Sequence, residues 1–570
     1  MIPSENVLPE IWWKDKIVYQ IYPKSFYDSN GDGNGDLQGV IQKLPYLKEL
    51  GIDIIWLCPV FRSPMSDNGY DISDYYGIDP RFGTNDDMTE LIHKAHQIGI
   101  RIILDLVINH SSDEHPWFRE ALANPRGEMA KFYIFREGVK DGPPNNWRAI
   151  FGGSVWEKVG SSNLYYYHTF GKKQPDLNWE NPKLRGQLYK MVNWWLDQGI
   201  AGFRIDAIAF IKKNQSYESY PADDSDGLVA VQKGGENQPG IEVFLRELKE
   251  KTFARHNCLT VAEATGVPIE ELGKYTGKDG FFSMIFNFLL SDMDLVPDFR
   301  WYDRKPWKVK DFRDLFYHVM IETQKTGYNP NFLENHDSPR SLNHFIPPED
   351  IGCYSATMLA TIFLMARGVP FIYQGEELGM TNCVMTSMDE FDDLSTHDQY
   401  ERGRKAGLSH TEVMDAMNFR SRDHSRTPMQ WNNEKNAGFT TGSPWLKVNP
   451  NYTGINAAQQ AGDPRSVLSY YKALIALRKA PLTGKILTDG DFAIYPAEDV
   501  NLICYTRSIA EVGSILVINN FSASNSRVLL HAAYKKAVKS NYQKFTIKEG
   551  YLHLQPYQSV ILSTEIKSKQ

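Results

Sequence analysis

The chain has 570 residues, a length that at about 100–200 residues per domain predicts about three domains or one large barrel with additions. Apolar residues make up 42% and charged residues 23%, which is typical of a globular chain and excludes disordered and fibrous classes. The 62 Lys and Arg residues against 70 Asp and Glu residues give a net charge of −8, which argues against a nucleic-acid-binding protein. Aromatic residues are abundant, and both a sugar-binding pocket and a large core would account for them.

The cysteine pattern and the apolar segments bear on the compartment. The 5 cysteines are scattered without a C-x-x-C pair, so neither a disulfide framework nor a zinc site is predicted. The first residues lack the basic and apolar regions of a secretory signal. No apolar run reaches the roughly 18 residues of a membrane span. We therefore expect a cytoplasmic protein without a membrane as partner. We also expect a monomer that binds no nucleic acid.

Short apolar runs rich in β-branched residues alternate with helical patterns along most of the chain. Eight such runs indicate buried strands, at residues 17–23, 52–60, 100–109, 202–208, 258–264, 281–288, 331–337 and 369–376. Apolar residues at helical spacing, as in 183–198 and 242–253, lie between most of them. Eight strands alternating with helices predict an α/β fold, namely a (β/α)₈ TIM barrel.

Two parts of the chain depart from this alternation. The interval between the third and fourth strands is longer than one helix requires and is rich in Trp, Tyr, Asn and Gly. We therefore expect an inserted domain B at residues 111–180. Short alternating strands predict a C-terminal antiparallel β-sandwich, domain C, at 481–570. The barrel, domain A, then comprises 1–110 and 181–480.

Polar residues end four of the predicted strands, the third, fourth, fifth and seventh. In chain order these strand ends contain Asp105, Asn109, His110, Arg204, Asp206, Glu263, Asn335, His336 and Asp337. Barrel enzymes carry catalytic groups at the carboxyl ends of their strands. A single acid at such a place can merely cap the next helix, but carboxylates on several strands indicate one shared site.

Two of these carboxylates have different predicted surroundings. Arg204 and Asp206 are two positions apart and share a face of the strand, so the guanidinium favours an ionised Asp206, as a nucleophile needs. Glu263 lies between alanines on an apolar strand, where desolvation favours the protonated form that a general acid needs. Such a pair predicts glycoside hydrolysis, with retention of configuration if the carboxyls are ~5–5.5 Å apart.

The four strand-end segments resemble the signature regions of the α-amylase family of glycoside hydrolases. The similarity begins at Trp12-Trp13-Lys14 and covers nearly the whole chain. Gln174-Pro-Asp-Leu-Asn is similar to the fifth region of the oligo-1,6-glucosidase group, which also holds α-glucosidases, dextran glucosidases, trehalose-6-phosphate hydrolases and sucrose isomerases. The resemblance implies that Asp206 is the nucleophile, Glu263 the acid/base and Asp337 the transition-state stabiliser.

The same resemblance implies a pocket for the non-reducing glucose of an α-glucoside. The implied residues are Asp67, Tyr70, His110, Phe151, Phe170, Gln174, Arg204, His336 and Arg422. Polar members of this set would bond sugar hydroxyls, while Tyr70 and Phe170 would pack on the apolar face of the ring. Hydrogen bonds that tighten in the oxocarbenium-like state would stabilise it more than the ground state.

A glycine-rich loop after the first strand has oxygen-bearing side chains at alternate positions. The residues are Asp28, Asn30, Asp32, Asn34 and Asp36, a spacing that suits a hard cation such as Ca²⁺. Position 12 of the loop is Gly39 rather than Glu, so the loop is not an EF-hand, and an Asx-rich turn without an ion is the alternative. The family resemblance implies a structural Ca²⁺ or Mg²⁺, with Asn34 contributing its backbone carbonyl.

The residue after the nucleophile distinguishes members of the group, since Val there accompanies α-1,6 specificity and Ala or Thr accompanies α-1,4 or sucrose activity. The resemblance implies an exo-acting α-glucosidase. Ala207 favours maltose-like or broader short α-glucosides as its substrates, with isomaltose, sucrose and transglucosylation left open. Sucrose isomerisation is the alternative, because Asp303-Arg304 matches half of the isomerase Arg-x-Asp-Arg-x loop, although Trp301 replaces its first Arg.

Two further members of the group fit the sequence less well. Trehalose-6-phosphate hydrolysis would need a cationic phosphate site, and the sequence indicates none. A non-catalytic relative would have lost the acids and would carry a membrane span near its start, whereas this chain retains all three carboxylates.

Overall fold

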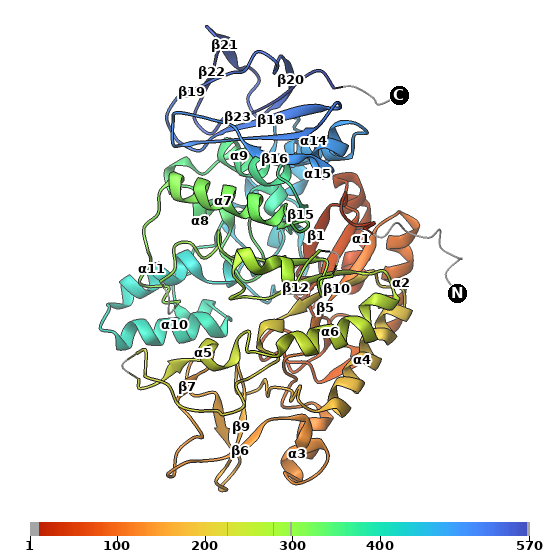
Figure 1. The fold of residues 1–570 in the computed structure, drawn as a ribbon, viewed down its shortest axis with the longest axis vertical. Coiled ribbons are helices and arrows are strands. Elements are labelled where there is room, and N and C mark those ends of the chain that lie inside the picture. The colour runs from red at the N-terminus through yellow and green to blue at the C-terminus, as the bar shows by residue number, and fades with distance from the viewer. Residues whose placement is uncertain (1–10, 225, 278, 297–298, 567–570) are drawn as a thin grey trace.

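A computed structural model describes residues 11–224, 226–277, 279–296 and 299–566 of the chain. A central body of strands and helices is flanked by a β domain formed by the C-terminal part of the chain and, at the opposite end, by a smaller region containing β6, β7, β9 and α3 (Figure 1).

The central body is built on a parallel sheet of eight strands, in the order β13, β12, β10, β5, β2, β1, β15 and β14. Their bounds are Val18–Ile21 (β1), Ile54–Leu57 (β2), Arg101–Val107 (β5), Gly202–Asp206 (β10), Leu259–Glu263 (β12), Met284–Phe286 (β13), Pro330–Asn331 (β14) and Val369–Tyr373 (β15). Seven of them lie within the predicted ranges, and β14 begins one residue before its range. The predicted TIM barrel is confirmed.

The seventh barrel strand is much shorter than the predicted run of 331–337. Beyond Asn331 the chain turns, with the backbone N–H of Asp337 donating to Asn335 Oδ1 at 2.8 Å and that of Asn335 donating to Ser338 Oγ at 3.0 Å. Asn and Ser side chains compete in this way with strand ladders for backbone groups. The prediction of a full strand was therefore wrong, and the turn places His336 and Asp337 beyond the carboxyl end of β14.

Helices cover the outside of the barrel sheet (Figure 1). The main ones are α1 Leu37–Leu50, α2 Asn85–Gln97, α4 Pro182–Asp197, α6 Ile241–Lys251, α7 Val309–Thr323, α9 Cys353–Leu364 and α14 Val467–Lys479. Side chains at several N-termini accept backbone N–H bonds, as Asp36 does from Gly39 in α1 and Thr84 does from Asp87 in α2. In the described part of the chain, no helix combines the length and apolar character needed to cross a membrane.

The segment between β5 and α4 forms a small antiparallel sheet of its own, in the order β6, β9, β8. The main elements of this segment are α3 Pro116–Ala123, β6 Phe135–Glu137, β7 Trp147–Arg148, β8 Trp156–Lys158 and β9 Leu164–Tyr167. Strand β7 pairs with β11 (Val229–Ala230), which lies beyond β10 in the chain. Trp147 is fully buried and stacks near Tyr217 and Tyr220 of that later segment. Residues after β10 therefore pack against the inserted segment.

The C-terminal part of the chain forms two antiparallel sheets. One has the order β16 Asp491–Ile494, β17 Leu502–Ile509, β18 Gly513–Asn520, β23 Ser559–Ser563, β20 Lys536–Ser540, and the other β19 Ser526–Leu529, β22 Tyr551–Leu554, β21 Thr546–Lys548. Leu516 and Ile518 of the first sheet belong to one buried cluster with Leu552 and Leu554 of the second. The two sheets therefore pack face to face, and the predicted C-terminal antiparallel β domain is confirmed.

Two helices between β15 and the C-terminal region form a hairpin at the side of the barrel (Figure 1). They are α10 Leu394–Lys405 and α11 His410–Arg420, followed by the short α12 Asp423–Arg426. The hairpin has an apolar cluster of its own, including Val413 and Met417, against which Trp301 and Tyr302 pack. It thereby contacts the loop that follows β13.

Candidate active site

The candidate nucleophile and acid/base share one guanidinium at the carboxyl edge of the barrel sheet. Asp206 and Glu263 are the last residues of β10 and β12, which are neighbours in the sheet. Arg204 donates from Nη1 to Asp206 Oδ1 at 2.7 Å and from Nη2 to Glu263 Oε2 at 2.6 Å. The structure therefore brings together the two carboxylates that the sequence predicts as a pair.

The charge balance around Arg204 differs from the sequence argument. Its Nη1 also donates to Asp105 Oδ1 at 2.7 Å, so one cation serves three carboxylates. Burial raises the pKa of Asp206 well above its ordinary value, Arg204 opposes this shift, and the charges of Glu263 and Asp105 add to it. Arg204 therefore exerts only one of several competing effects on the ionisation of Asp206, and desolvation is the largest of them.

Asp105 is a buried member of this cluster to which the sequence analysis assigned no role. Besides Arg204, it accepts hydrogen bonds from Trp56 Nε1 and from the Tyr70 hydroxyl, both at 3.0 Å. Asp105 is the register partner of Arg204 across β5 and β10. Asp105 is the first of the polar residues at the end of the third predicted strand, and paired positions on two adjacent parallel strands lie close together. This was the signal from which its contact with Arg204 could have been predicted.

The third candidate carboxylate, Asp337, lies among basic side chains. It accepts from Arg422 Nη1 at 3.0 Å and from Arg426 Nη2 at 2.8 Å, and His336 Nε2 lies 3.1 Å from its other oxygen. Burial by itself would raise the pKa of Asp337, but His336, Arg422 and Arg426 together lower it below the ordinary range. Asp337 therefore carries a negative charge at neutral pH. Burial lowers the pKa of His336 to about 3, so this imidazole is neutral there.

The polar residues predicted for the glucose pocket form one connected network. Gln174 Nε2 donates to Asp67 Oδ2 at 3.0 Å and lies 3.2 Å from His110 Nε2, while Arg422 Nη2 is 3.6 Å from Asp67 Oδ1. Burial raises the pKa of Asp67 to about 7, although Arg422 opposes the shift. Burial also lowers the pKa of His110 to about 4, which leaves a neutral ring. The structure therefore gathers all four residues in one place.

The aromatic residues predicted for the pocket lie against this network. The Phe170 ring centroid is 5.2 Å from that of His110 and 5.7 Å from that of Phe151. The Arg422 guanidinium lies 5.3 Å from the Phe151 ring centroid. Tyr70 stacks on His336 at 5.4 Å between centroids, with the rings 10° from parallel. The pocket thus combines apolar ring faces with charged and amide groups, the combination expected where a sugar binds.

Two residues that the sequence analysis missed hold the charged groups of the pocket in place. Asp393 Oδ1 accepts from Arg422 Nε at 2.8 Å, and its side chain also caps α10. Arg426 donates from Nε to the backbone carbonyl of His336 at 2.8 Å, next to its bond to Asp337. Both residues come from the chain beyond β15, far in sequence from the strand ends that they support, and no local pattern marks them.

The residue after the candidate nucleophile turns the chain sharply. Ala207 has φ 42°, in the left-handed region, and its backbone N–H donates to Glu263 Oε2 at 3.2 Å. Its side chain is buried and belongs to an apolar cluster that includes Ala209 and Phe210. A change of side chain here therefore acts next to the reacting groups.

The segment that presents Gln174 is anchored by a buried ion pair. Asp176 accepts from the backbone N–H of Thr169 at 2.7 Å and pairs with Lys213 Nζ at 2.5 Å. Lys213 also donates to Asn109 Oδ1 at 3.0 Å. The fifth-region segment is in this way attached to the end of β5 and to the chain after β10.

The predicted cation loop is closed by its own hydrogen bonds. Asp28 accepts from the backbone N–H groups of Asn30, Gly31 and Gly33 at 3.0, 2.7 and 2.8 Å, and Asn30 and Asp32 each accept from the residue two positions on. Asp36 is engaged with Ser29 and with the start of α1. Within the described residues, no three His, Cys, Asp or Glu side chains form a group able to hold a metal. The predicted ligand set also includes two Asn residues and a backbone carbonyl, so the structural ion stays a prediction.

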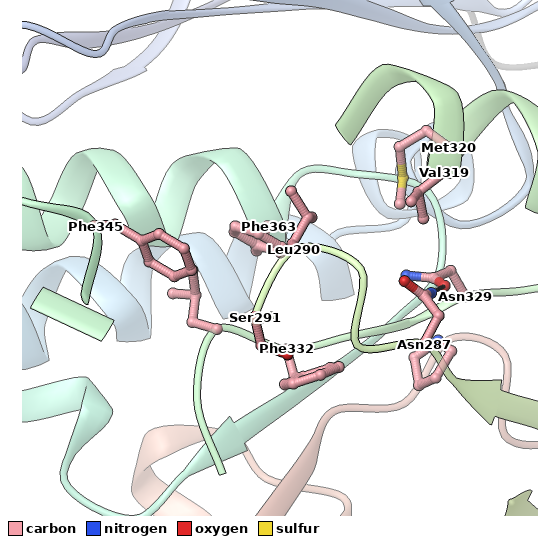
Figure 2. Close-up of a pocket in the computed structure, with 11 residues that line it drawn as sticks. Asn287, Leu290, Ser291, Val319, Met320, Asn329, Phe332, Phe345 and Phe363 are labelled. Carbon is pink, nitrogen blue, oxygen red and sulfur yellow. Dashed lines mark hydrogen bonds between the residues drawn. The ribbon is translucent and has the colours of Figure 1, made fainter. Parts of the chain in front are cut away.

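The cavity shown in Figure 2 lies outside the carboxylate cluster, where β13 and β14 face each other. Its volume is about 20 Å³, and Leu290, Ser291, Phe332 and Phe345 are among the residues that line it. Asn287 Nδ2 donates to Asn329 Oδ1 at 2.9 Å beside it. A space of this size holds a water molecule, not a sugar.

Comparisons with known proteins agree with this geometry. Residues 20–490 match the model of the alpha-amylase catalytic domain, and 502–561 match that of the alpha-amylase SusG C-terminal domain. The oligo-1,6-glucosidase of Parageobacillus thermoglucosidasius is 41% identical over 559 residues, 97% of this chain and 99% of that relative.

Two solved structures are similar to this chain over nearly its full length. The isomaltulose synthase of Klebsiella sp. LX3 has a TM-score of 0.91 at 37% identity, covering 99% of this chain and 100% of that one. The trehalose-6-phosphate hydrolase of Bacillus licheniformis has a TM-score of 0.88 at 38% identity, covering 97% and 99%. The chain is a member of the alpha-amylase family of glycoside hydrolases, family 13.

Proposed function

We propose that this enzyme is an exo-acting, retaining α-glucosidase that removes the terminal non-reducing glucose from short α-glucosides. The observation that carries the proposal is the placement of Asp206 and Glu263 on adjacent nitrogens of Arg204, next to the network of Asp67, His110 and Gln174. Reacting carboxylates and sugar-binding groups then serve one glucose unit.

In this proposal Asp206 attacks the anomeric carbon, and Glu263 gives its proton to the departing glycosidic oxygen. A covalent glucosyl–Asp206 ester forms as the bond to the leaving group breaks. Glu263 then removes a proton from water, whose oxygen attacks the anomeric carbon and releases Asp206. The anionic Asp337 stabilises the positive charge that develops on the sugar ring in both steps.

The shared guanidinium supports retention rather than inversion. Retaining enzymes hold the two carboxyls ~5–5.5 Å apart, and inverting enzymes leave ~6.5–9.5 Å for a water molecule between them. Oxygens at 2.7 and 2.6 Å from the two terminal nitrogens of Arg204 favour the closer arrangement. Retention also accommodates transglucosylation, in which a sugar hydroxyl replaces water in the second step.

The substrates that we propose are maltose-like, isomaltose-like and sucrose-type disaccharides. The small Ala207 beside Glu263 supports a roomy site for the second sugar. The curated relatives at 41–43% identity that carry the name oligo-1,6-glucosidase support inclusion of α-1,6 bonds. A panel of disaccharides, with product analysis by anion-exchange chromatography, ranks the linkages.

Sucrose isomerisation is the second candidate, because solved isomaltulose and trehalulose synthases are among the similar structures. Arg304, the Arg retained from the isomerase loop, lies 3.5 Å from the Phe419 ring centroid and is thus packed against α11. Incubation with sucrose decides the matter, since isomaltulose or trehalulose as the main product would overturn the hydrolase proposal.

The experiment that tests the proposed reaction is proton NMR of the products during cleavage of 4-nitrophenyl α-glucoside. The proposal expects α-glucose as the first product, with β-glucose rising later by mutarotation. First release of β-glucose would show inversion, and no glucose release from any α-glucoside would overturn the proposed function.

We also infer a cytoplasmic location, supported by five free cysteines that include the buried Cys58, Cys383 and Cys504. Fractionation of the source cells tests this inference. The monomeric state stays a prediction, and light scattering during gel filtration tests it.

A further inference from the structure

A second acidic position lies beside Glu263, on the loop that follows β13. Glu263 and Phe286 are register partners at the carboxyl ends of β12 and β13. The chain then continues through Leu290 and Ser291, which line the cavity in Figure 2, to Asp292. Asp292 is close enough to Glu263 for their charges to interact. Glu263 ends β12 and Asp292 follows β13 in the chain, so both come after paired strands at the same edge of the barrel sheet.

The Asp292 carboxylate is recessed but open to solvent. Its side chain is 37% exposed, whereas that of the nearby Asp294 is 3% exposed. Burial by the surrounding protein raises the pKa of Asp292 to about 6, Arg420 opposes the shift, and Asp294 and Glu263 add to it. Asp292 is therefore mainly ionised at neutral pH and can accept a hydrogen bond from a hydroxyl group.

A buried arginine holds this loop in one position. Arg420, at the end of α11, donates to Asp292 Oδ1 at 3.0 Å, to Asp294 Oδ1 at 2.7 Å and to the backbone carbonyl of Ser291 at 3.0 Å. His344 Nε2 lies 3.2 Å from Asp294 on the same side. Within the described residues, Arg420 is the one hydrogen-bond donor to the Asp292 carboxylate. One oxygen is thus engaged and the other stays available to a ligand.

The position of Asp292 relative to the reaction indicates what it would contact. Glu263 protonates the glycosidic oxygen in the proposed mechanism, so a group beyond Glu263 faces the leaving sugar rather than the terminal glucose. The glucose network of Asp67, Gln174 and Arg422 has no hydrogen bond to Asp292 within the described part of the chain. Asp292 is thus set apart from the groups that bind the first sugar.

We propose that Asp292, fixed by Arg420, accepts a hydrogen bond from a hydroxyl of the second sugar and so helps determine which leaving groups and acceptors the enzyme uses. This inference rests on the proposed α-glucosidase function. It assigns a specificity role to Asp292 and a positioning role to Arg420. A hydroxyl-bearing sugar gains this contact, whereas an aromatic leaving group does not.

The test compares Asp292→Ala and Asp292→Asn with the wild type on maltose, isomaltose and 4-nitrophenyl α-glucoside. We expect kcat/KM for the preferred disaccharide to fall about ten- to a hundredfold in Asp292→Ala, the loss typical of a hydrogen bond to a charged group. For the aryl glucoside it should change less than about threefold. Transfer of glucose to maltose should fall relative to hydrolysis, and Asp292→Asn should lose less, because its amide oxygen still accepts.

Glu271→Gln is the matched control, since Glu271 follows β12, pairs with Lys274 at 2.7 Å and is 48% exposed in its side chain. It should leave all three activities unchanged. An equal fall on disaccharide and aryl substrates in both Asp292 variants would overturn the proposal, because it would show a general effect on the site. Unchanged disaccharide cleavage would overturn it as well. A wild type without activity on any α-glucoside would instead refute the proposed function itself.

Discussion

Arg426→Lys tests whether the basic side chains around Asp337 act in the transition state. Arg426 is fully buried and forms a fork, with Nη2 donating to Asp337 Oδ1 at 2.8 Å and Nε donating to the His336 carbonyl at 2.8 Å. Lysine keeps the positive charge but cannot make both bonds from one planar group. Loss of one hydrogen bond to a charged partner costs about 1.5–3 kcal/mol, and about 1.4 kcal/mol corresponds to a factor of ten in rate.

The expected result is therefore a kcat about ten- to a hundredfold lower than that of the wild type, with KM changed little, because Asp337 stabilises charge that appears only in the transition state. Initial rates on 4-nitrophenyl α-glucoside over a range of substrate concentrations separate the two constants. Circular dichroism and the Tm of each variant report on folding in parallel.

Arg478→Lys is the control for the loss of a buried arginine as such. Arg478 donates to the backbone carbonyls of Leu364, Ala366 and Gly368 at 2.7, 3.1 and 2.7 Å. Its replacement should lower the Tm without changing kcat. A kcat within about threefold of the wild type in Arg426→Lys would refute the role given to this arginine. An equal loss of kcat in the two variants would also refute it, because the effect would then be one of stability.

Three further predictions concern the cation loop, the second sugar and the pH dependence. Dialysis against EDTA should lower the Tm by several degrees if the loop 28–36 holds a structural ion, since a ligand bound only to the folded state stabilises it; an unchanged Tm would show that the loop needs no ion. Ala207→Val should raise the ratio of the kcat/KM for isomaltose to that for maltose, and the corresponding change in discrimination energy should be at most about 1–3 kcal/mol per methylene. An unchanged ratio would assign the second-sugar site to the loops after β12 and β13. Burial raises the pKa of Asp67 to about 7, so kcat/KM should rise as the pH increases through this value and the carboxylate becomes able to accept from a sugar hydroxyl; if Asp67→Asn kept the same limb, another group would be titrating.

Much of the barrel could be predicted from the sequence, because buried parallel strands are apolar runs with a recognisable length. The ends of β10 and β12 could be located for the same reason, since Asp206 and Glu263 interrupt such runs. The short β14 was not foreseen, because the side chains of Asn335 and Ser338 take over the backbone bonds of a strand. The pattern of apolar residues alone does not show this competition of side chains for backbone hydrogen bonds.

The supporting residues of the site were harder to predict than the strand ends. Arg426 and Asp393 contact Asp337 and Arg422 across long stretches of chain, and only the folded structure shows these pairs. The charge state of Asp206 also depends on long-range neighbours, because Asp105 and Glu263 share its guanidinium. Arg204 alone therefore does not set the charge state of Asp206, because desolvation and two negative charges act on it as well.

The most direct test of the central claim is to identify the residue that carries the glucosyl group in the covalent intermediate. A 5-fluoro-α-glucosyl fluoride slows the second step, so mass spectrometry of the intact protein and then of its peptic peptides can find the label. The proposed mechanism predicts one fluoroglucosyl group per chain, on the peptide that contains Asp206, and no label in Asp206→Asn. A label on Glu263, or complete turnover through an inverted product with no labelled protein, would contradict it.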